Sequence, residues 1–245
     1  MTKENYLLWE AYMLSCMEDS AHDKEHIYRV LYMALDIART EQNVNRDVLV
    51  CACLLHDIGR KEQFENPAVC HAQAGADKAY VFLKEHHYEE EFAKQVRACI
   101  RSHRFRKDNF PQSIEAKILF DADKIDVCGT LGIARTLLYK GQMAQPLYSV
   151  SEDGAVLDGA EDGRESFFRE YKYKLEGIYD SFYTERGREI AGQRRAAAVN
   201  FYQSLFREVC TIHEEGPEFL RELMDGKAEC PHNGPGAGKP EMKNF

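Results

Sequence analysis

Four residues in this chain combine metal-binding side chains with positions that face inward on amphipathic helices. They are His26, His56, Asp57 and Asp123. Two imidazoles and two carboxylates make a mixed nitrogen and oxygen ligand set, which suits a hard or borderline ion such as Mn²⁺, Fe²⁺, Mg²⁺ or Zn²⁺. Because a buried charge without a partner is costly, an inward acid needs a metal, a cation or hydrogen bonds. The pattern therefore predicts a metal centre inside the fold.

The helical period around these residues indicates how they are positioned. His26 shares the apolar stripe of its helix with Val30. His56 ends the apolar run 48–55 and would close a second helix. Asp123 falls on the apolar face of a third helix, where burial alone would favour leucine. A single inward histidine is most often a satisfied core residue, but separate predicted helices supply this set.

The helical period continues through most of the chain, and no stretch alternates like a strand of a parallel sheet. We predict helices at residues 4–18, 22–40, 47–57, 70–86, 90–103, 113–125, 130–140, 164–183, 187–213 and 216–224. The exception is 147–159, where Asp153-Gly154 between short apolar segments favours a hairpin. We expect this segment to be either a short β-hairpin flap over the site or an ordinary connection between helices.

Length and composition predict one large helical domain over residues 1–225. Residues 226–245 are rich in Gly and Pro and are expected to be disordered. The net charge of -9 argues against a surface that coats nucleic acid, because such surfaces need basic stripes. An anionic ligand would instead require a local positive patch.

The cysteine pattern and the N-terminus predict a cytoplasmic location. The 8 cysteines have no CxxC spacing and most lie in apolar helical patterns, so we expect reduced core residues in a reducing compartment. The N-terminus lacks the basic start and uniform apolar stretch of a signal peptide. The longest apolar run, 48–55, is too short to cross a bilayer, so no membrane partner is expected.

Three sequence blocks, in order, resemble the HD-domain metal-dependent phosphohydrolases. They are HDKEHIYRV around His26, ACLLHDIGR around the His56-Asp57 pair, and EAKILFDADKIDVCGTLGIART around Asp123. The likeness extends from about residue 19 to about residue 207 and is greatest to the bacterial soluble group that includes nucleotide pyrophosphohydrolases. Asp121 and Asp126 are competing ligands within the third block. Asp123 is preferred because it follows Ala122, as in the Ala-Asp of the family.

This resemblance implies an all-α fold, a single HD-domain helical bundle, with one divalent metal ion. Its ligands would be His26, His56, Asp57 and Asp123. Mn²⁺ is our first choice, with Fe²⁺, Mg²⁺, Zn²⁺, Co²⁺ and Ni²⁺ as alternatives. The resemblance also implies a small-molecule phosphate substrate, and we expect a monomer or a homodimer.

Two further histidines are candidates for the reaction centre, because the resemblance suggests that such residues face the metal pocket. His71 and His103 could bind substrate phosphate, donate a proton or hold a second metal. His103 is embedded in the basic stretch RSHRFRK, residues 101–107. Basic groups gathered in an acidic chain would attract phosphate, although a charge run is often only a solvated face. The predicted phosphate-binding residues of this stretch are Arg101, Arg104 and Arg106.

Two arginines occupy positions that read as apolar. Arg194 falls on a predicted stripe with Ala197 and Phe201, and Arg135 is flanked by apolar residues. Inward guanidinium groups need anions. They are expected either to hold substrate phosphate or to form structural salt bridges.

These residues together predict hydrolysis of a nucleotide or a related phosphate ester. The first choice is conversion of a nucleoside triphosphate to a monophosphate and pyrophosphate, with a divalent ion activating water and polarising phosphorus-bound oxygen. Asp57 is the first candidate and Asp126 the second for accepting the water proton, with His103 as a further catalytic residue. Many HD enzymes carry an acid close behind the pair, and whether Glu62 has that role stays open. The alternative is a metal-stabilised nucleotide-binding regulatory module with little turnover.

Overall fold

The computed structural model describes residues 1–17, 24–104, 109–160 and 162–226 of the chain. Over these ranges the protein is helical, and its one β feature is an isolated antiparallel bridge. The predicted all-α class is confirmed. The predicted disorder of 226–245 falls almost wholly outside the described residues.

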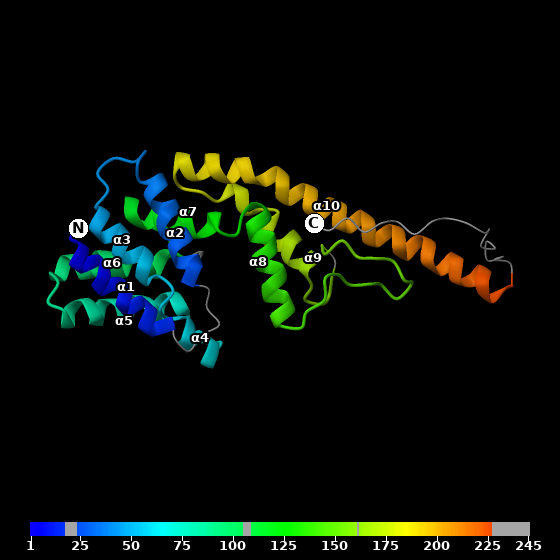
Figure 1. The fold of residues 1–245 in the computed structure, drawn as a ribbon, viewed down its shortest axis with the longest axis horizontal. Coiled ribbons are helices and arrows are strands. Elements are labelled where there is room, and N and C mark those ends of the chain that lie inside the picture. Colours follow the sequence, from blue (N-terminus) through cyan, green and yellow to red (C-terminus); the bar gives the residue numbers. More distant parts are fainter. Residues whose placement is uncertain (18–23, 105–108, 161, 227–245) are drawn as a thin grey trace, which may run out of the picture.

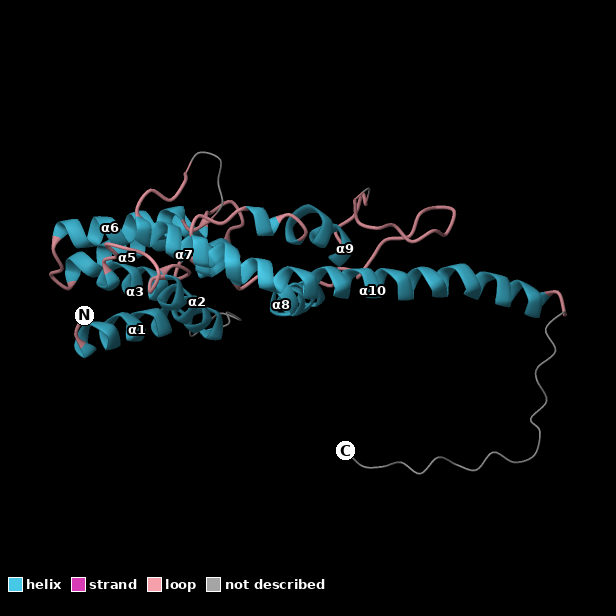
Figure 2. Ribbon diagram, turned by 90° about the horizontal axis from the view of Figure 1, so that it is seen from above, coloured by secondary structure: helices cyan, strands magenta, loops and turns pink. Residues whose placement is uncertain are grey.

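The helices form a compact body from which one long helix extends (Figure 1). The first seven are α1 (Lys3–Met17), α2 (Lys24–Ile37), α3 (Arg46–Leu55), α4 (Arg60–Glu65), α5 (His71–Glu85), α6 (Glu90–Ser102) and α7 (Ile114–Ile125). They are followed by α8 (Gly129–Gln142), α9 (Phe167–Glu170), the π-helix η1 (Tyr171–Leu175), the 3₁₀-helix η2 (Ile178–Asp180) and α10 (Glu185–Met224). Figure 2 shows α10 running past α8 and beyond the body.

Helix α3 is the centre of the body. Every residue from Val48 to Leu55 is buried, as expected for a helix that is apolar on all sides. Helices α1, α2, α5, α6 and α7 all contact it. Its first turn is fixed by Asn45, whose side chain accepts a hydrogen bond from the Val48 amide, while Glu115 on α7 accepts one from the Asn45 amide at 2.7 Å. The His56-Asp57 pair therefore follows the most buried helix of the fold.

A buried carboxylate joins α7 to the start of α10. Asp121 is fully buried and accepts hydrogen bonds from the amides of Tyr183 and Thr184 and from the Thr184 hydroxyl. The Thr184 side chain in turn caps α10 by accepting from the Gly187 amide. A Cβ on Gly187 would lie 2.7 Å from Asp121 Oδ2, so the junction requires glycine there. Asp121, one of the competing metal ligands, is thus accounted for by backbone donors.

The helix boundaries differ from prediction mainly after residue 164. The predicted helix 164–183 is divided into α9, η1 and η2, and the two helices predicted over 187–213 and 216–224 are one continuous helix with Pro217 inside it. The predicted apolar face of α10 is off by one position. Ala197 is exposed, whereas Ala198 and Tyr202 are buried. Short helix α4 was not predicted, because Gly59 reads as a stop.

The segment 147–159 forms a minimal hairpin. Val150 pairs with Val156 in an antiparallel bridge, and Gly154 has the positive φ of 91° that the turn requires. The segment lies beside α9 and points away from α2, α3 and α5 (Figure 1). Tyr148 instead stacks edge-on against His213 of α10. Of the two alternatives for this segment, the structure supports the connection between helices, because the hairpin contacts the protruding helix α10.

No helix among the described residues is long and apolar enough to span a membrane.

We predict that Asp121→Ala lowers the free energy of unfolding by about 3 kcal/mol, because it leaves several buried donors at the start of α10 without an acceptor. Ser113→Ala, which removes the ordinary side-chain cap of α7, should cost about 1 kcal/mol. Urea unfolding of both variants measures the difference, and metal analysis should find wild-type content in each. Metal loss with unchanged stability in Asp121→Ala would contradict this structural role.

Candidate metal centre

Three helices bring the four predicted ligands together at the centre of the body. His26 comes from α2, His56 and Asp57 follow α3, and Asp123 lies on α7. His26 Nε2 is 3.3 Å from Asp123 Oδ1 and 3.6 Å from Asp57 Oδ2. His56 Nε2 is 3.4 Å from His26 Nε2. The ligand atoms of His26, His56 and Asp123 lie within 4.8 Å of one another, as a metal site requires.

Each histidine of the centre has its Nδ1 held by an oxygen acceptor. The acceptor is the Cys53 carbonyl for His56 and the Ile100 carbonyl for His103. It is the Gln63 side-chain oxygen for His71. Asp126 Oδ2 lies 2.7 Å from His26 Nδ1. A hydrogen on Nδ1 leaves the Nε2 lone pair free in the neutral ring, so all four rings present Nε2 as a ligand atom.

Asp57 lies between two groups of ligands. Its Oδ2 faces His26 and His56, while its Oδ1 lies 3.6 Å from His71 Nε2 and 3.7 Å from His103 Nε2. Asp57, His71 and His103 form a second set within metal-binding reach. No donor meets hydrogen-bond geometry at the buried Oδ1, although Arg60 Nε forms an ion pair with it at 2.9 Å. A carboxylate oxygen such as Asp57 Oδ1, surrounded by the Nε2 atoms of His71 and His103, could bind a metal cation.

A close backbone contact places His71 beside Asp57. A Cβ on Gly59 would lie 2.3 Å from the His71 carbonyl oxygen and 2.4 Å from the Gly75 nitrogen. Only glycine permits the segment after Asp57 to approach α5 so closely. The approach carries His71, the first residue of α5, into the centre.

The charges of the centre support one another. Burial alone would lower the pKa of His26, but hydrogen bonds to Asp123 and Asp126 raise it to about 9. Burial lowers the pKa of His56 to about 4. Although burial opposes ionisation of Asp57, Arg60 and the histidines hold its pKa well below the usual range. Burial also opposes ionisation of Asp123, and its hydrogen bond with His26 lowers the pKa of that carboxyl. The centre thus offers ionised carboxylates to an ion.

Asp126 lies on the far side of His26 from the other ligands. It is buried and forms ion pairs with Arg29 and Arg135 as well as its contact with His26 Nδ1. Burial opposes its ionisation, but these partners lower its pKa to about 2. The sequence offered Asp126 as an alternative metal ligand and as a base. Its contact with His26 Nδ1 instead places it to orient the His26 ring.

The predicted phosphate-binding arginines are not all gathered at the centre. Arg104 follows His103, and its charge lowers the pKa of His71 after burial and Arg60. Arg101 is exposed on α6, and Arg106 lies outside the described residues. Arg135 pairs with Asp126, whereas Arg194 donates to the Ile125 carbonyl at 2.9 Å.

Two arginines of the centre were not identified from the sequence. Arg60 contacts Asp57, and Arg29 pairs with Asp126 through Nε at 2.8 Å. Their spacing from the ligands was an available signal, because each lies three residues after an identified residue and so shares its helical face or turn. Glu62, by contrast, pairs with Lys78 at 2.7 Å and does not join the ligand groups.

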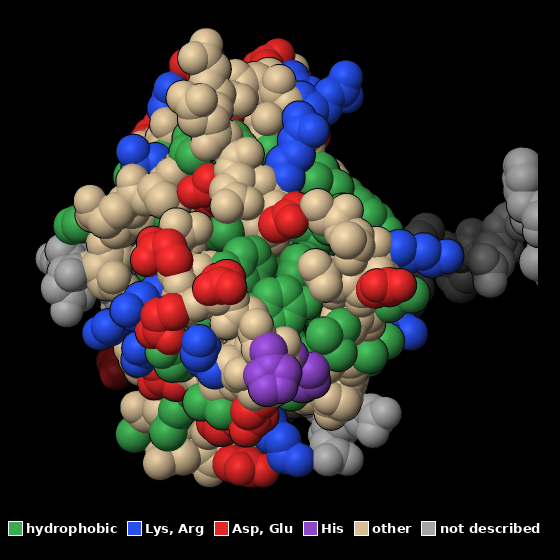
Figure 3. Space-filling model, turned by 90° about the vertical axis from the view of Figure 1, so that its left-hand side faces the viewer, with side chains coloured by type: hydrophobic (Ala, Val, Ile, Leu, Met, Phe, Trp, Pro, Cys, Tyr) green, Lys and Arg blue, Asp and Glu red, His purple; other side chains and the backbone are tan. Residues whose placement is uncertain are grey.

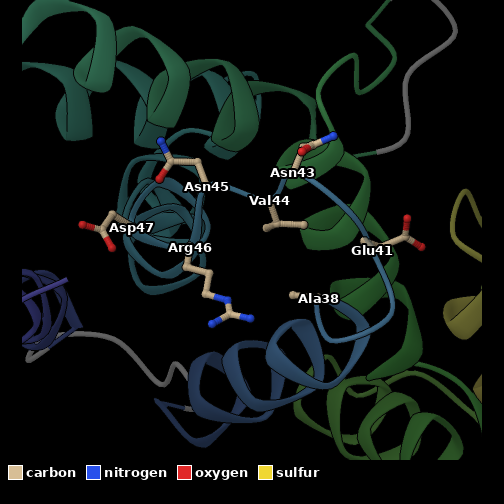
Figure 4. A pocket seen from close by; sticks show the side chains of 7 residues that line it. All are labelled: Ala38, Glu41, Asn43, Val44, Asn45, Arg46 and Asp47. Carbon is tan, nitrogen blue, oxygen red and sulfur yellow. The ribbon is translucent and has the colours of Figure 1, made fainter.

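The centre is buried except at Asp123, whose side chain is 25 % exposed. A separate hollow of about 580 Å³ lies at the connection between α2 and α3, where Arg46 and Asp47 are among the lining residues (Figure 4). None of the proposed ligands lines it, so it carries no part of the site. Figure 3 shows the end of the molecule to the left in Figure 1, where acidic and basic side chains alternate without a continuous basic band.

A family model, a curated relative and solved structures all match this chain. The HD domain family model matches residues 24–128, which contain all four predicted ligands. The chain is 26 % identical over 202 residues to the Bacillus subtilis protein YpgQ, covering 81 % of this chain and 89 % of YpgQ. A Bacillus thuringiensis HD-superfamily hydrolase superimposes with a TM-score of 0.64 at 27 % identity, covering 84 % of this chain and 97 % of that one. The structure of YpgQ in complex with ADP has a TM-score of 0.64 at 23 % identity, covering 84 % and 95 %.

We predict that the apparent affinity for Mn²⁺ rises about tenfold per pH unit between about pH 6.5 and 8.5. His26 has a pKa of about 9 in the metal-free protein, so it is protonated over this range and must lose that proton to bind through Nε2. Calorimetric titration in buffers of different ionisation enthalpy measures the released proton. Asp126→Asn is the matched control, because it removes a charge that raises the pKa of His26 and should flatten the dependence. A flat profile in the wild type would contradict His26 as a ligand.

Proposed function

We propose that this chain, whose residues 24–128 match the HD domain family model and whose structure is similar to that of an HD-superfamily hydrolase, is a metal-dependent phosphohydrolase acting on a nucleotide or a related phosphate ester. The preferred reaction is hydrolysis of a nucleoside triphosphate at the α-phosphorus. The oxygen of water bonds to that phosphorus, the bond to the bridging oxygen breaks, and the products are a nucleoside monophosphate and pyrophosphate. The proposed ligand is a small molecule and not a nucleic acid. The protein is proposed to act in the cytoplasm as a monomer or a homodimer.

One observation carries this proposal: four imidazole Nε2 atoms surround the Asp57 carboxylate, and the Asp123 carboxylate lies 3.3 Å from one of them, on His26. The ligand set proposed for one divalent ion is His26, His56, Asp57 and Asp123, with Mn²⁺ preferred. A bound ion supplies Lewis acidity toward a phosphoryl oxygen and makes water more acidic. The Asp123 side chain is 25 % exposed, and substrate is proposed to approach the centre from this side.

The remaining residues of the centre suit a phosphate substrate. Arg60 and Arg104 place positive charge around His71, and we assign them to binding phosphate oxygens. His71 belongs to the same binding group. The complex of the structural relative YpgQ with ADP supports a nucleotide as the ligand class.

We assign separate roles to the titratable groups of the reaction. His103 lies beside Asp57 with Nε2 directed inward, and its imidazolium form, which also carries a hydrogen on Nε2, is proposed to give that proton to the leaving oxygen. Asp57 is proposed to position the attacking water as well as to bind the ion. Asp126 is a positioning residue that holds the His26 ring, because its three partners and low pKa leave it a poor proton acceptor.

A nucleotide panel with added Mn²⁺ tests the reaction class. Equal amounts of monophosphate and pyrophosphate from a triphosphate are expected, identified by chromatography and pyrophosphate detection. Release of inorganic phosphate alone would contradict attack at the α-phosphorus. Tight nucleotide binding without any product would favour the alternative, a regulatory module with little turnover.

We predict that Asp57→Asn and His56→Ala each lower kcat by at least a hundredfold, because each removes a group that binds the ion directly. Circular dichroism of both variants should stay helical. Glu62→Gln is the matched control, because Glu62 pairs with Lys78 outside the ligand groups and its loss should leave turnover unchanged. Full activity and full metal content in the first two variants would make the His-Asp pair structural.

We predict that Arg104→Ala raises KM about tenfold with a small change in kcat, because it removes positive charge near His71. Arg101→Ala, on the exposed face of α6, should leave KM unchanged. His103→Ala should mainly lower kcat and remove one limb of the pH profile. Steady-state kinetics across pH separate these effects, and equal KM changes in the two arginine variants would contradict the assignment.

A further inference from the structure

A cleft of about 470 Å³ lies between α2, α7 and α10 on the opposite side of His26 from the metal ligands. Asp126 lines it and contacts His26 Nδ1, while His26 Nε2 faces Asp57 and Asp123. The cleft is therefore separated from the candidate metal centre by the His26 ring and Asp126. Its volume is within the usual range for small-molecule sites.

Arg194 gives the cleft a fixed positive charge. Its guanidinium donates to the Ile125 carbonyl, and no carboxylate among the described residues lies within ion-pair distance of it. The stem of the side chain is held by Gly129, where an added Cβ would lie 2.9 Å from Arg194 Cβ. A guanidinium with a fixed stem, a neutral partner and half-buried surroundings is prepared to receive an anion.

The other walls suit a flat, partly apolar body attached to that anion. Tyr32 is 63 % exposed at the edge of the cleft. One face of its ring stacks against Tyr28 with the ring centroids 6.3 Å apart, so the stacking proposed here uses the other face. Met33, Leu131 and Ile190 provide apolar lining, and Gln193 offers an amide. The combination of one oriented guanidinium, an open aromatic ring and an apolar floor is the chemistry that recognises a nucleotide.

We propose that this cleft is a second nucleotide-binding site, distinct from the metal centre, in which Arg194 pairs with a phosphate and Tyr32 stacks on the base. The site does not require a metal ion, because its phosphate partner is a guanidinium. A nucleotide bound there lies against Arg29 and Asp126, the residues that hold the far side of His26. A nucleotide in the cleft would therefore contact the residues that orient His26, one of the proposed metal ligands.

Calorimetric titration of ADP into the full-length, Mn²⁺-loaded protein tests this site. Arg194→Gln and Tyr32→Ala should each weaken one binding event about tenfold or more. Arg195→Ala is the matched control for charge, because Arg195 stacks over Tyr179 outside the cleft. Arg60→Ala should weaken a different event, the one at the metal centre. Melting curves of the variants check that the fold is retained, and Tyr32 is exposed enough for its loss to be tolerated.

The outcomes separate this site from the proposed reaction. If Arg194→Gln and Tyr32→Ala bind ADP as the wild type does, the second site is overturned, whatever the result for Arg60→Ala. If Arg60→Ala leaves both binding events unchanged while Arg194→Gln and Tyr32→Ala each weaken one, the metal-centre assignment is contradicted and the cleft assignment stands. Adenosine and inorganic phosphate should each bind the cleft at least tenfold more weakly than ADP. Phosphate binding as tight as that of ADP would overturn the nucleotide assignment.

Discussion

The structure depends on keeping four imidazoles and two carboxylates buried in one place without losing their hydrogen bonds. Each Nδ1 has its own oxygen partner, so every ring is fixed in orientation before any ligand arrives. Three of these partners are not charged, and the fourth is Asp126. The arrangement directs the Nε2 atoms toward Asp57, whose Oδ2 faces His26 and His56 and whose Oδ1 also forms an ion pair with Arg60, so a metal cation could bind among them.

The backbone around this centre is shaped by the same requirement. Helix α3 is buried on all sides, so it delivers His56 and Asp57 to the middle of the body. The contact of Gly59 with Gly75 then brings α5 close enough for His71 to reach Asp57. On the other side, Asp121 attaches the start of α10 to α7 through backbone donors. Two aspartates two residues apart on one helix thus have different purposes: Asp121 joins helices, and Asp123 faces the metal ligands.

The His26 ring connects the two candidate ligand sites. Its Nε2 belongs to the metal centre, and its Nδ1 is held by Asp126 together with Arg29 and Arg135. Because Asp126 also lines the cleft beside α10, binding on one side of His26 can influence the other through a short path of contacts. By thermodynamic linkage, any such influence would act equally in both directions.

The sequence by itself determined the helical class and the histidines and aspartates that meet at the candidate metal centre. Periodicity placed His26 and Asp123 on inward faces, because a helix repeats its apolar contacts at fixed steps that can be counted along the chain. Only the tertiary structure decided the partners of the remaining charges. The sequence offered Asp126 as a candidate base, whereas in the structure it contacts His26 Nδ1. Arg194 donates to the Ile125 carbonyl, and α10 buries Ala198 and not Ala197. One helical position rotates a side chain by about 100°, and loops such as 147–159 carry no period at all. Local pattern therefore determines which residues point inward, whereas the docking of distant helices determines what they meet there.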